Sequence, residues 1–489
     1  MSAIELQHVS KRYGKVQALN DVSLKVGQGE LFGLIGPDGA GKTSLFRIMA
    51  TLLLADEGQI KVDGFDVVKQ YRDIRKRIGY MPGKFSLYQD LTVEENLHFF
   101  ADLFGTTFEE GYEIVKPIYS QIEPFRKRKA GALSGGMKQK LALSCALIHE
   151  PSVLFLDEPT TGVDPVSRKE LWEMLEMLKE RHITIVAATP YLDEIRRFER
   201  IAYLDQGNLR DIDTPENILT QYADVFNPTG LNRQESLSQK PSVEDNEVIR
   251  VSHLVKAFGS FRAVDDISFT VHRGEIFGFL GANGAGKTTA MRILTGLSKP
   301  TGGQGSVAGF DIRHASEQIK RHIGYMSQRF SLYEDMTVAQ NIELFGGIYG
   351  MKRGEINQKM DDMLKHIQFE DHRNTMVKSL PLGWKQKLAF SVSIFHDPDV
   401  VFLDEPTGGV DPATRKQFWQ LIYDASKRGI TVFVTTHYMD EAEYCDRISI
   451  MVDGKIRAMD SPQALKQTYQ CETMDDVFTL LARQATREE

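Results

Sequence analysis

The sequence has few cysteines and no long apolar run, and these two absences exclude several classes of protein. Its three cysteines, Cys145, Cys445 and Cys471, have no C-x-x-C spacing. Neither a disulfide framework nor a zinc module is therefore indicated, in agreement with a reducing cytoplasm. No apolar stretch is long enough to cross a bilayer. We expect that the chain cannot form a membrane channel by itself.

Positive charge is not in excess either. The 59 Lys and Arg residues are outnumbered by 67 Asp and Glu residues, for a formal net charge of −8. Electrostatics therefore give no general reason to bind nucleic acid. The N-terminal stretch MSAIELQHVSKRY contains no apolar signal core, so we expect the protein to stay in the compartment where it is made.

An internal repeat divides the chain into two copies of one domain. GPDGAGKTS at residues 36–44 matches GANGAGKTT at residues 281–289, with an offset of 245 between Lys42 and Lys287. LFLDEPT and VFLDEPT match with an offset of 247. A polar stretch with Pro and Gly separates the copies. We predict one domain at 1–225, a linker at 226–247 and a second domain at 248–489.

Both copies contain G-x-x-x-x-G-K-[ST], a loop whose backbone N–H groups can surround a phosphate at the positive end of a helix. The lysine adds charge near the β and γ phosphates, and the next hydroxyl can bind Mg²⁺. Nucleotide-binding residues are predicted in the first copy at Gly36, Gly39, Gly41, Lys42, Thr43 and Ser44. In the second copy they are Gly281, Asn283, Gly284, Ala285, Gly286, Lys287, Thr288 and Thr289.

Paired carboxylates follow an apolar run in each copy. VLFL before Asp157 and VVFL before Asp404 are typical of strands buried on both faces of a parallel sheet. Such strands deliver the next residues to the ligand edge. We expect Asp157 and Asp404 to support Mg²⁺, and Glu158 and Glu405 to act on the attacking water.

Aromatic residues end the β-type runs that precede each phosphate loop. Tyr13 in the first copy and Phe258 in the second could each stack on an adenine ring. Alternatively, each ring packs on the sheet as an ordinary core aromatic.

Over nearly its full length the chain resembles a tandem nucleotide-binding protein of the ATP-binding-cassette (ABC) family. The resemblance rests on both phosphate loops, both LDEPT stretches, LSGGMKQK at 133–140, GVDP at 162–165 and 409–412, and THYMDEAE at 436–443. It implies two tandem α/β P-loop NTPase domains that bind ATP and Mg²⁺. Each would have a mainly parallel sheet core, an antiparallel β subdomain and a helical subdomain, and the two would face head to tail as a pseudo-dimer.

Two family residues are present only in the second copy. The resemblance places Gln328 where a glutamine reaches the metal and the attacking water, and His437 where a histidine contacts the γ-phosphate. The first copy has Gly83 and Pro190 at these positions. Gly83 has no side chain, and Pro190 has neither a polar side chain nor a backbone donor.

The signature turn is complete only in the first copy, as LSGGM at 133–137. The resemblance assigns contacts with a γ-phosphate across an interface to three of its residues, Ser134, Gly135 and Gly136. The second copy has LPLGW at 380–384, where Pro381 removes a donor and Leu382 adds bulk. Trp384 could simply fill the altered turn as a core aromatic.

In a head-to-tail arrangement all these defects fall in one site. The complete site would contain Lys287, Gln328, Glu405, His437 and residues 133–137. The degenerate site would contain Lys42, Gly83, Glu158, Pro190 and residues 380–384. Glu158 is still present, so slow hydrolysis there stays open.

Three stretches resemble sequences of the ABC-2 type, the branch of the family that exports drugs, polysaccharides and lipids. They are GVDP, HYMDEAE and the C-terminal MDDVFTLLARQ. This resemblance implies two integral permease subunits, with a periplasmic adaptor as a further candidate partner, and a location on the inner face of the cell membrane. No nucleic-acid partner is expected. Two alternatives stay open: the ATPase of a sugar importer, and a non-membrane ABC ATPase that acts on a ribosome or nucleic acid.

Near-identical aromatic segments, KFSLYQDLTVEENL and RFSLYEDMTVAQNI, occur in both copies. In the family this segment lines a groove for a cytoplasmic helix of the membrane subunit. The matched residues are Phe85, Leu87 and Tyr88 in the first copy and Phe330, Leu332 and Tyr333 in the second. The alternative is that they pack the helical subdomain internally.

Overall fold

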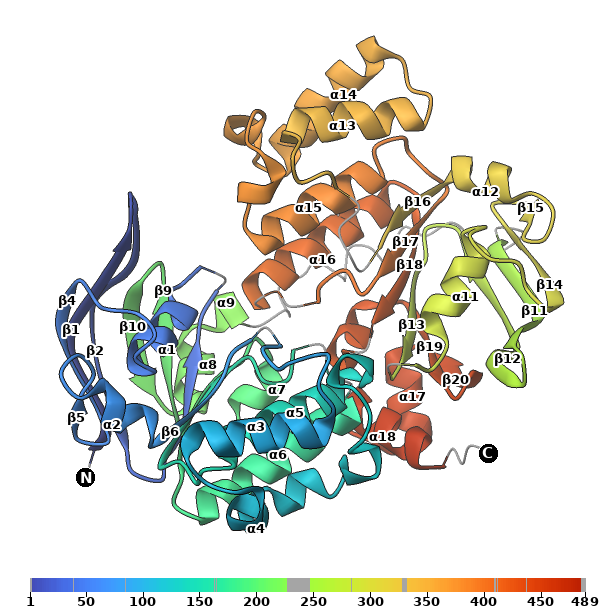
Figure 1. The fold of residues 1–489 in the computed structure, drawn as a ribbon. Helices are drawn as coiled ribbons and strands as arrows, with labels where there is room; N and C mark the ends of the chain where they lie inside the picture. Colours follow the sequence, from blue (N-terminus) through green and yellow to red (C-terminus); the bar gives the residue numbers. More distant parts are fainter. Residues whose placement is uncertain are drawn as a thin grey trace. The chain divides into compact units, whose positions relative to one another are not determined.

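The apolar runs of the sequence become the strands of two parallel sheets in the computed structural model, one in each of two units (Figure 1). One unit is formed mainly by residues before about position 230 and the other mainly by residues after it; we call them the first half and the second half. The described residues are 2–37, 39–83, 85–161, 163, 165–226, 247–282, 284–327, 332–408, 410, 412–436 and 438–484. Of the predicted linker, residues 227–246 lie outside them.

The first half has a six-stranded sheet in the order β10-β9-β3-β8-β7-β6, parallel except at the β9 and β10 edge. Its strands are β3 (Leu31–Ile35), β6 (Ile78–Met81), β7 (Val153–Asp157), β8 (Thr184–Ala188), β9 (Arg200–Asp205) and β10 (Asn208–Asp213). Strands β3, β7 and β8 are buried at every residue. This burial on both faces explains the uninterrupted apolar sequences.

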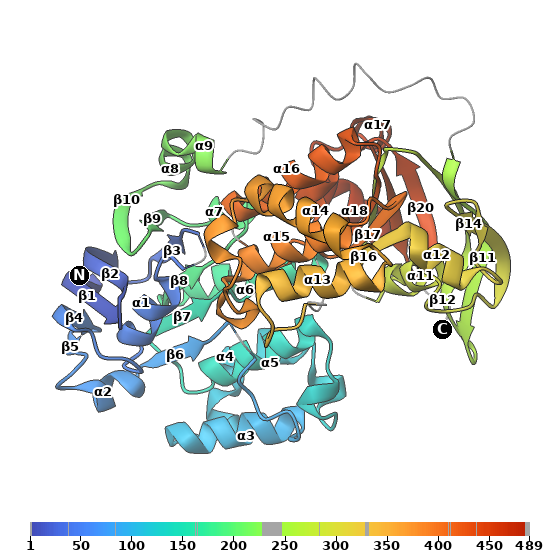
Figure 2. The same ribbon diagram turned by 90° about the horizontal axis from the view of Figure 1, so that it is seen from above.

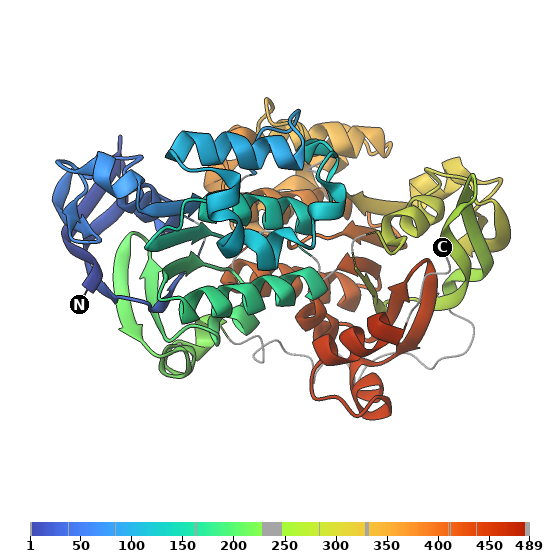
Figure 3. The ribbon, with the colours of Figure 1, turned by 60° about the horizontal axis from the view of Figure 1, so that its bottom comes forward.

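Successive side chains of β7 enter two different cores because a strand alternates its faces. Leu154 and Leu156 pack with helices α3 to α6, whereas Val153 and Phe155 pack with α1 and an antiparallel sheet of order β2-β1-β4-β5. Figures 2 and 3 show these layers from two further directions. The remaining elements are β1 (Ser2–Tyr13), β2 (Val16–Gly27), β4 (Glu57–Val62), β5 (Phe65–Asp66), α1 (Lys42–Met49), α2 (Tyr71–Arg75), α3 (Val93–Phe104), α4 (Phe108–Tyr119), α5 (Gly135–Leu147), α6 (Pro165–Glu180), α7 (Leu192–Ile195), α8 (Pro215–Gln221) and α9 (Ala223–Phe226).

The second half repeats this architecture, with sheets of order β16-β17-β18-β13-β19-β20 and β12-β11-β14-β15. Its strands are β11 (Glu247–Phe258), β12 (Phe261–His272), β13 (Ile276–Gly281), β14 (Gly302–Val307), β15 (Phe310–Asp311), β16 (Ile323–Met326), β17 (Val400–Asp404), β18 (Thr431–Thr436), β19 (Arg447–Val452) and β20 (Lys455–Asp460). Its helices are α11 (Lys287–Leu294), α12 (Ser316–His322), α13 (Val338–Ile348), α14 (Arg353–His366), α15 (Leu382–Ser393), α16 (Pro412–Lys427), α17 (Pro462–Thr468) and α18 (Met474–Gln484), with a 3-10 segment η7 (Met439–Tyr444). Among the described residues, no helix is long and apolar enough to cross a membrane.

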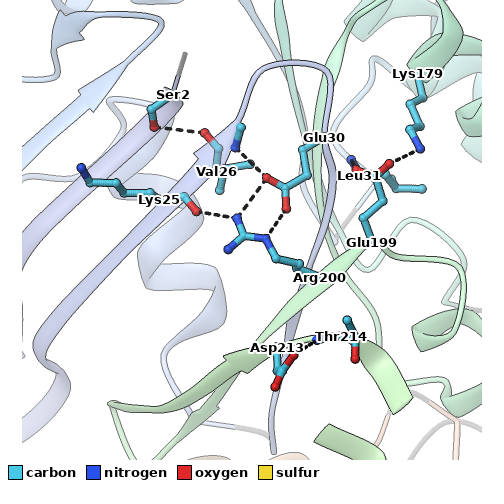
Figure 4. Close-up of polar contacts among 11 residues, drawn as sticks. Ser2, Lys25, Val26, Glu30, Leu31, Lys179, Glu199, Arg200, Asp213 and Thr214 are labelled. Carbon is cyan, nitrogen blue, oxygen red and sulfur yellow. Dashed lines mark hydrogen bonds and ion pairs between the residues drawn. The ribbon is translucent and has the colours of Figure 1, made fainter. Parts of the chain in front are cut away.

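An ion pair joins the antiparallel sheet to the parallel sheet in each half. In the first half, Arg200 Nε lies 2.8 Å from Glu30 Oε1, and Arg200 also donates to the backbone oxygen of Lys25 (Figure 4). In the second half, Arg447 Nε lies 2.7 Å from Glu275 Oε1. Strands β3 and β13, which precede the phosphate loops, are thereby held near the β1–β2 and β11–β12 hairpins. The first strand of each hairpin ends at an aromatic residue, Tyr13 or Phe258.

Candidate functional site

Each predicted phosphate loop lies between a buried strand and a helix, β3 and α1 in the first half, β13 and α11 in the second. Gly41 and Gly286 precede these helices with φ values of 102° and 104°, a region that disfavours side chains. A Cβ on Gly41 would lie 2.3 Å from the oxygen of Ala18, and one on Gly286 would lie 2.1 Å from the oxygen of Ala263. Glycine is therefore required at both positions. Asn283 lies outside the described residues.

The lysine of each loop is buried and turned back into the loop. Lys42 Nζ donates to the backbone oxygens of Gly36 at 2.7 Å and Pro37 at 3.1 Å. Lys287 Nζ donates to Gly281 at 2.7 Å and to Ala282 at 3.0 Å. Each loop thus wraps around one ammonium group, which gives it the positive charge that a triphosphate requires.

Hydroxyl and carboxylate oxygens meet at the end of the strand next to each loop. Thr43 Oγ1 donates to Asp157 Oδ2 at 2.9 Å in the first half, and Thr288 lies beside Asp404 in the second. These are the hard oxygen donors that Mg²⁺ prefers. Burial raises the pKa of both aspartates, and a divalent cation would oppose that effect by favouring the charged carboxylate. Thr43 with Asp157 in the first half, and Thr288 with Asp404 in the second, therefore fit a magnesium site.

The glutamates that follow have an unusual backbone. Glu158 has φ 54° and Glu405 has φ 48°, in the left-handed region that non-glycine residues seldom adopt and that often occurs at functional sites. The Glu405 N–H donates to the backbone oxygen of Thr435 at 3.0 Å. Glu405 Oε1 lies 3.9 Å from Lys287 Nζ, so this carboxylate borders the predicted γ-phosphate position.

The other residues predicted to mark the complete site lie outside the described residues, namely Gln328 and His437. Their counterparts in the first half are described. A Cβ on Gly83 would lie 3.1 Å from the backbone oxygen of Asp157, and Pro190 is buried. The first half therefore presents backbone and a ring where the family has polar side chains.

The two signature turns differ as the sequence indicates. Helix α5 begins after Ser134, whose hydroxyl caps it by accepting from Met137 N at 3.4 Å, and Ser134 and Gly135 are exposed. Helix α15 begins after Pro381 without a side-chain cap. Trp384 lies half-buried there, 4.8 Å from Phe369 between ring centroids. The altered turn is filled by aromatic packing.

The family model for the ABC transporter matches residues 19–161 and 264–408, which cover both phosphate loops and both carboxylate pairs. The chain belongs to the ABC transporter family. Its halves are ATP-binding cassettes, and cassettes of this family are ATPases. This ABC chain is 38% identical to a probable multidrug ABC transporter ATP-binding protein of Escherichia coli (strain K12), over 95% of this chain and 94% of that protein.

More distant relatives of this ABC chain have other names. A protein of Halalkalibacterium halodurans named for ribose/galactose/methyl galactoside import is 27% identical over 93% of this chain and 90% of its own length. Among solved structures, an RNase-L inhibitor superposes with a TM-score of 0.68 at 21% identity, over 95% of this chain and 92% of that one. That likeness shows the fold alone.

Both predicted adenine-stacking rings are accessible in the two cassettes. Tyr13 ends β1 and is 45% exposed, and Phe258 ends β11 and is 58% exposed. Lysine ammonium groups lie over both rings, Lys11 at 5.9 Å and Lys256 at 5.2 Å from the centroids. Because about half of each aromatic side chain is exposed, a ligand can reach both rings and stack on them.

One residue of the site was not predicted from the sequence. Thr435 Oγ1 donates to Asp404 Oδ1 at 2.7 Å from the neighbouring strand β18. The first half has Ala188 at this position, paired with Asp157 in the same register. The signal was present in the sequence as VTTH against AATP, but it could be interpreted only once β17 and β18 were known to pair.

Proposed function

We propose that the chain is the ATP-hydrolysing subunit of an ABC-2 type exporter, that its halves face head to tail, and that one of its two nucleotide sites is complete. The observation that carries the asymmetry is the distribution of the losses. The first half lacks residues equivalent to Gln328 and His437. The second half lacks a complete signature turn. Only a head-to-tail arrangement collects these losses in one site and leaves the other whole.

Each residue of the complete site has a defined part in hydrolysis. Lys287 and the loop amides bind the β and γ phosphates, and Phe258 stacks on adenine. Asp404, Thr288 and Gln328 would hold Mg²⁺, which would neutralise charge on the phosphates. Glu405 orients the attacking water and takes its proton, and His437 contacts the γ-phosphate. The largely buried position of the Glu405 side chain beside Lys287 supports this assignment.

The N-terminus of α5 supports the part that the first half plays in the complete site. This helix has 13 residues, and its first N–H groups carry partial positive charge toward the exposed Ser134 and Gly135. Such an end suits a γ-phosphate that belongs to the other half. At the start of α15, Pro381 lacks both an N–H and a capping hydroxyl, and Leu382 adds bulk, so this end of the second half is less suited to contact a phosphate.

Exposed apolar side chains on each half support a membrane partner. Tyr88 is 51% exposed and packs edge to face against Phe99 at 4.8 Å. Asn96 fixes it in place by bonding both the N–H and the oxygen of Tyr88. Tyr333 is 55% exposed, and Asn341 makes the same two bonds to it. These paired bonds hold each tyrosine outward while the preceding leucine enters the core.

A groove of about 620 Å³ also lies on the second half, and its walls combine the apolar Leu297, Tyr325, Ile348 and Tyr349 with the charged Glu317, Lys320 and Arg321. Leu297 is 50% and Ile348 is 63% exposed. Exposed apolar clusters of this kind usually mark interaction sites. A short cytoplasmic helix of a permease is the occupant we propose, with the protein on the inner face of the cell membrane.

The exporter branch is favoured over sugar import by the relatives. The Escherichia coli relative named for multidrug transport is 38% identical, against 27% for the relative named for sugar import. The test is affinity purification from detergent-solubilised membranes, followed by identification of the co-purifying proteins. We expect polytopic membrane proteins of the exporter type. Recovery of sugar permeases, or sedimentation with ribosomes in place of membranes, would reject the proposal.

A further inference from the structure

A carboxylate is fully buried directly behind the proposed catalytic residues. Glu441 lies in η7, the segment that follows strand β18, and none of its surface is exposed. The hydroxyl of Thr407 donates a hydrogen bond to Glu441 Oε1. Arg415 Nε lies 3.5 Å from Glu441 Oε1. A buried charge is tolerated only with such partners.

Glu441 joins the two segments to which we assign hydrolysis. Its partner Thr407 follows Glu405 by two residues, and Glu441 itself lies in the segment that follows β18 and His437 in the sequence. Thr407 and Glu441 are both fully buried. The bond from Thr407 therefore holds the turn after Glu405 against the segment that follows β18.

Arg415 extends the same cluster into helix α16. Its Nη1 atom lies 2.9 Å from Asp440 Oδ2, and its guanidinium lies 5.1 Å from the ring centroid of Tyr438. Arg415 is only 4% exposed. The cluster therefore joins three parts of the chain: η7, the turn after Glu405 and helix α16.

The first half contains the same cluster without the catalytic residues. Glu194 is 1% exposed and accepts from Thr160 Oγ1 at 2.9 Å and from the hydroxyl of Thr189. Arg168 Nε lies 3.9 Å from Glu194 Oε1. Here the strand end leads to Pro190. The repeat thus supplies a carboxylate of nearly equal burial, bonded by the equivalent threonine and faced by the equivalent arginine, in a half that lacks the histidine.

We propose that Glu441 is a positioning residue for ATP hydrolysis, which holds the segment that follows His437 against the turn after Glu405 through Thr407. This inference rests on the proposed function, because it assumes that Glu405 and His437 act on the water and the γ-phosphate. A positioning role affects the chemical step more than nucleotide binding, since the phosphate loop and the aromatic strand end are separate elements.

The test measures kcat and KM for ATP with the full chain carrying Glu441→Gln or Thr407→Val. Glutamine removes the negative charge that faces Arg415 and offers one acceptor oxygen in place of two. We expect kcat to fall about 10-fold or more, as small displacements of reacting groups can cause, with KM for ATP changed less than about twofold. Thr407→Ser, which keeps the hydroxyl, should restore kcat.

The matched controls are Glu194→Gln and Thr160→Val in the first half. They make the same chemical change at the same burial, and we expect kcat to stay within about twofold. Thermal midpoints of all five variants separate folding from positioning. If Glu441→Gln does not fold, the near-isosteric Thr407→Val carries the test. Equal losses of kcat in the two halves, a loss confined to KM, or no rescue by serine would overturn the inference.

Glu405→Gln distinguishes this inference from the function on which it rests. If that variant keeps its turnover, the assignment of Glu405 is wrong and the proposed site fails. If it loses turnover while Glu441→Gln and Thr407→Val do not, the site stands and only the positioning role is rejected.

Discussion

Thr435 holds Asp404 by a hydrogen bond of 2.7 Å, and Ala188, its counterpart in the first half, cannot make this bond to Asp157. Asp157 accepts from the loop hydroxyl of Thr43. The carboxylate that we assign to Mg²⁺ is thus fixed from the neighbouring strand only in the half that carries the other catalytic residues. This difference adds a fourth asymmetry to the three that the motifs show.

The first prediction removes that bond. Thr435→Val keeps the shape of the side chain but loses the hydroxyl, and a hydrogen bond to a charged group contributes roughly 1.5–3 kcal/mol. We expect turnover to fall about 10-fold and the apparent Mg²⁺ affinity to weaken, both measured by ATPase assays in a magnesium titration. Ser393→Ala, which removes another buried hydroxyl that bonds only a backbone oxygen, is the control. An unchanged magnesium profile would contradict the role of Thr435.

The second prediction concerns the catalytic carboxylate. Glu405→Gln should lower ATP turnover about 100-fold or more, because a positioned general base typically contributes 10²–10⁴-fold. Glu158→Gln should cost far less, since the site that contains it lacks the glutamine and the histidine. Steady-state ATPase rates of the two purified variants decide the matter. Equal losses would rule out one complete and one degenerate site.

The third prediction tests the head-to-tail arrangement. Ser134→Arg places bulk and charge at the exposed start of α5, where we propose that the γ-phosphate held by Lys287 is contacted. Turnover should fall about 100-fold although Ser134 and Lys287 belong to different halves. Leu382→Arg, at the altered turn of the second half, is the matched control and should have a small effect. Normal turnover with Ser134→Arg would show that the arrangement is wrong.

Local features of the fold and the site could be predicted from the sequence. The phosphate loops and the buried strands before Asp157 and Asp404 were evident because each depends on neighbouring residues. The structure confirms the two-domain α/β architecture and the buried strands. The family model confirms the ABC resemblance.

Features that depend on long-range pairing could not be predicted. The bond between Thr435 and Asp404 requires the β17 and β18 register, which no local pattern encodes. Glu441 lies in an acidic stretch that is typical of a solvated helix face, yet the fold buries it completely. The alternation of buried Leu87 and exposed Tyr88 likewise depends on the position of Asn96 in the next helix.

The fourth prediction is a pH dependence of stability. His149 Nε2 donates to the carbonyl oxygen of Ile78 at 3.0 Å, and the ring stacks on Phe104. His396 repeats this arrangement with Ile323 and Tyr349. In both pairs the ring nitrogen is the donor, because a carbonyl oxygen only accepts. Burial lowers the pKa of both histidines to about 4.

The folded pKa of these histidines lies below the unfolded value of about 6.5, so the unfolded chain takes up protons first as the pH falls. Their contribution to stability is complete above about pH 6.5 and is lost toward pH 4. Between pH 7 and pH 5 each should cost roughly 1–2 kcal/mol. Thermal midpoints at the two pH values, compared with His149→Phe and with the exposed control His8→Gln, measure it. A slope that His149→Phe leaves unchanged would exclude His149 as its source.

The last prediction concerns the membrane partner. The double variant Tyr88→Ala and Tyr333→Ala should detach the protein from membranes, because exposed aromatic side chains commonly anchor interfaces. ATP binding and the fold should persist, since both tyrosines project outward from segments that Asn96 and Asn341 hold internally. Fractionation of cells that contain the partner proteins, together with a thermal midpoint of the purified variant, measures both effects.

Phe125→Ala is the control for this experiment, because Phe125 is also an exposed aromatic residue, at 36%, but lies outside the aromatic segment. Each tyrosine changed alone should weaken membrane binding only partly if the two halves engage two permease subunits, because two linked contacts reinforce one another. Full membrane association of the double variant would reject the docking surface. Unfolding of that variant would instead show that the tyrosines stabilise the helical subdomain, which the exposure of both rings argues against.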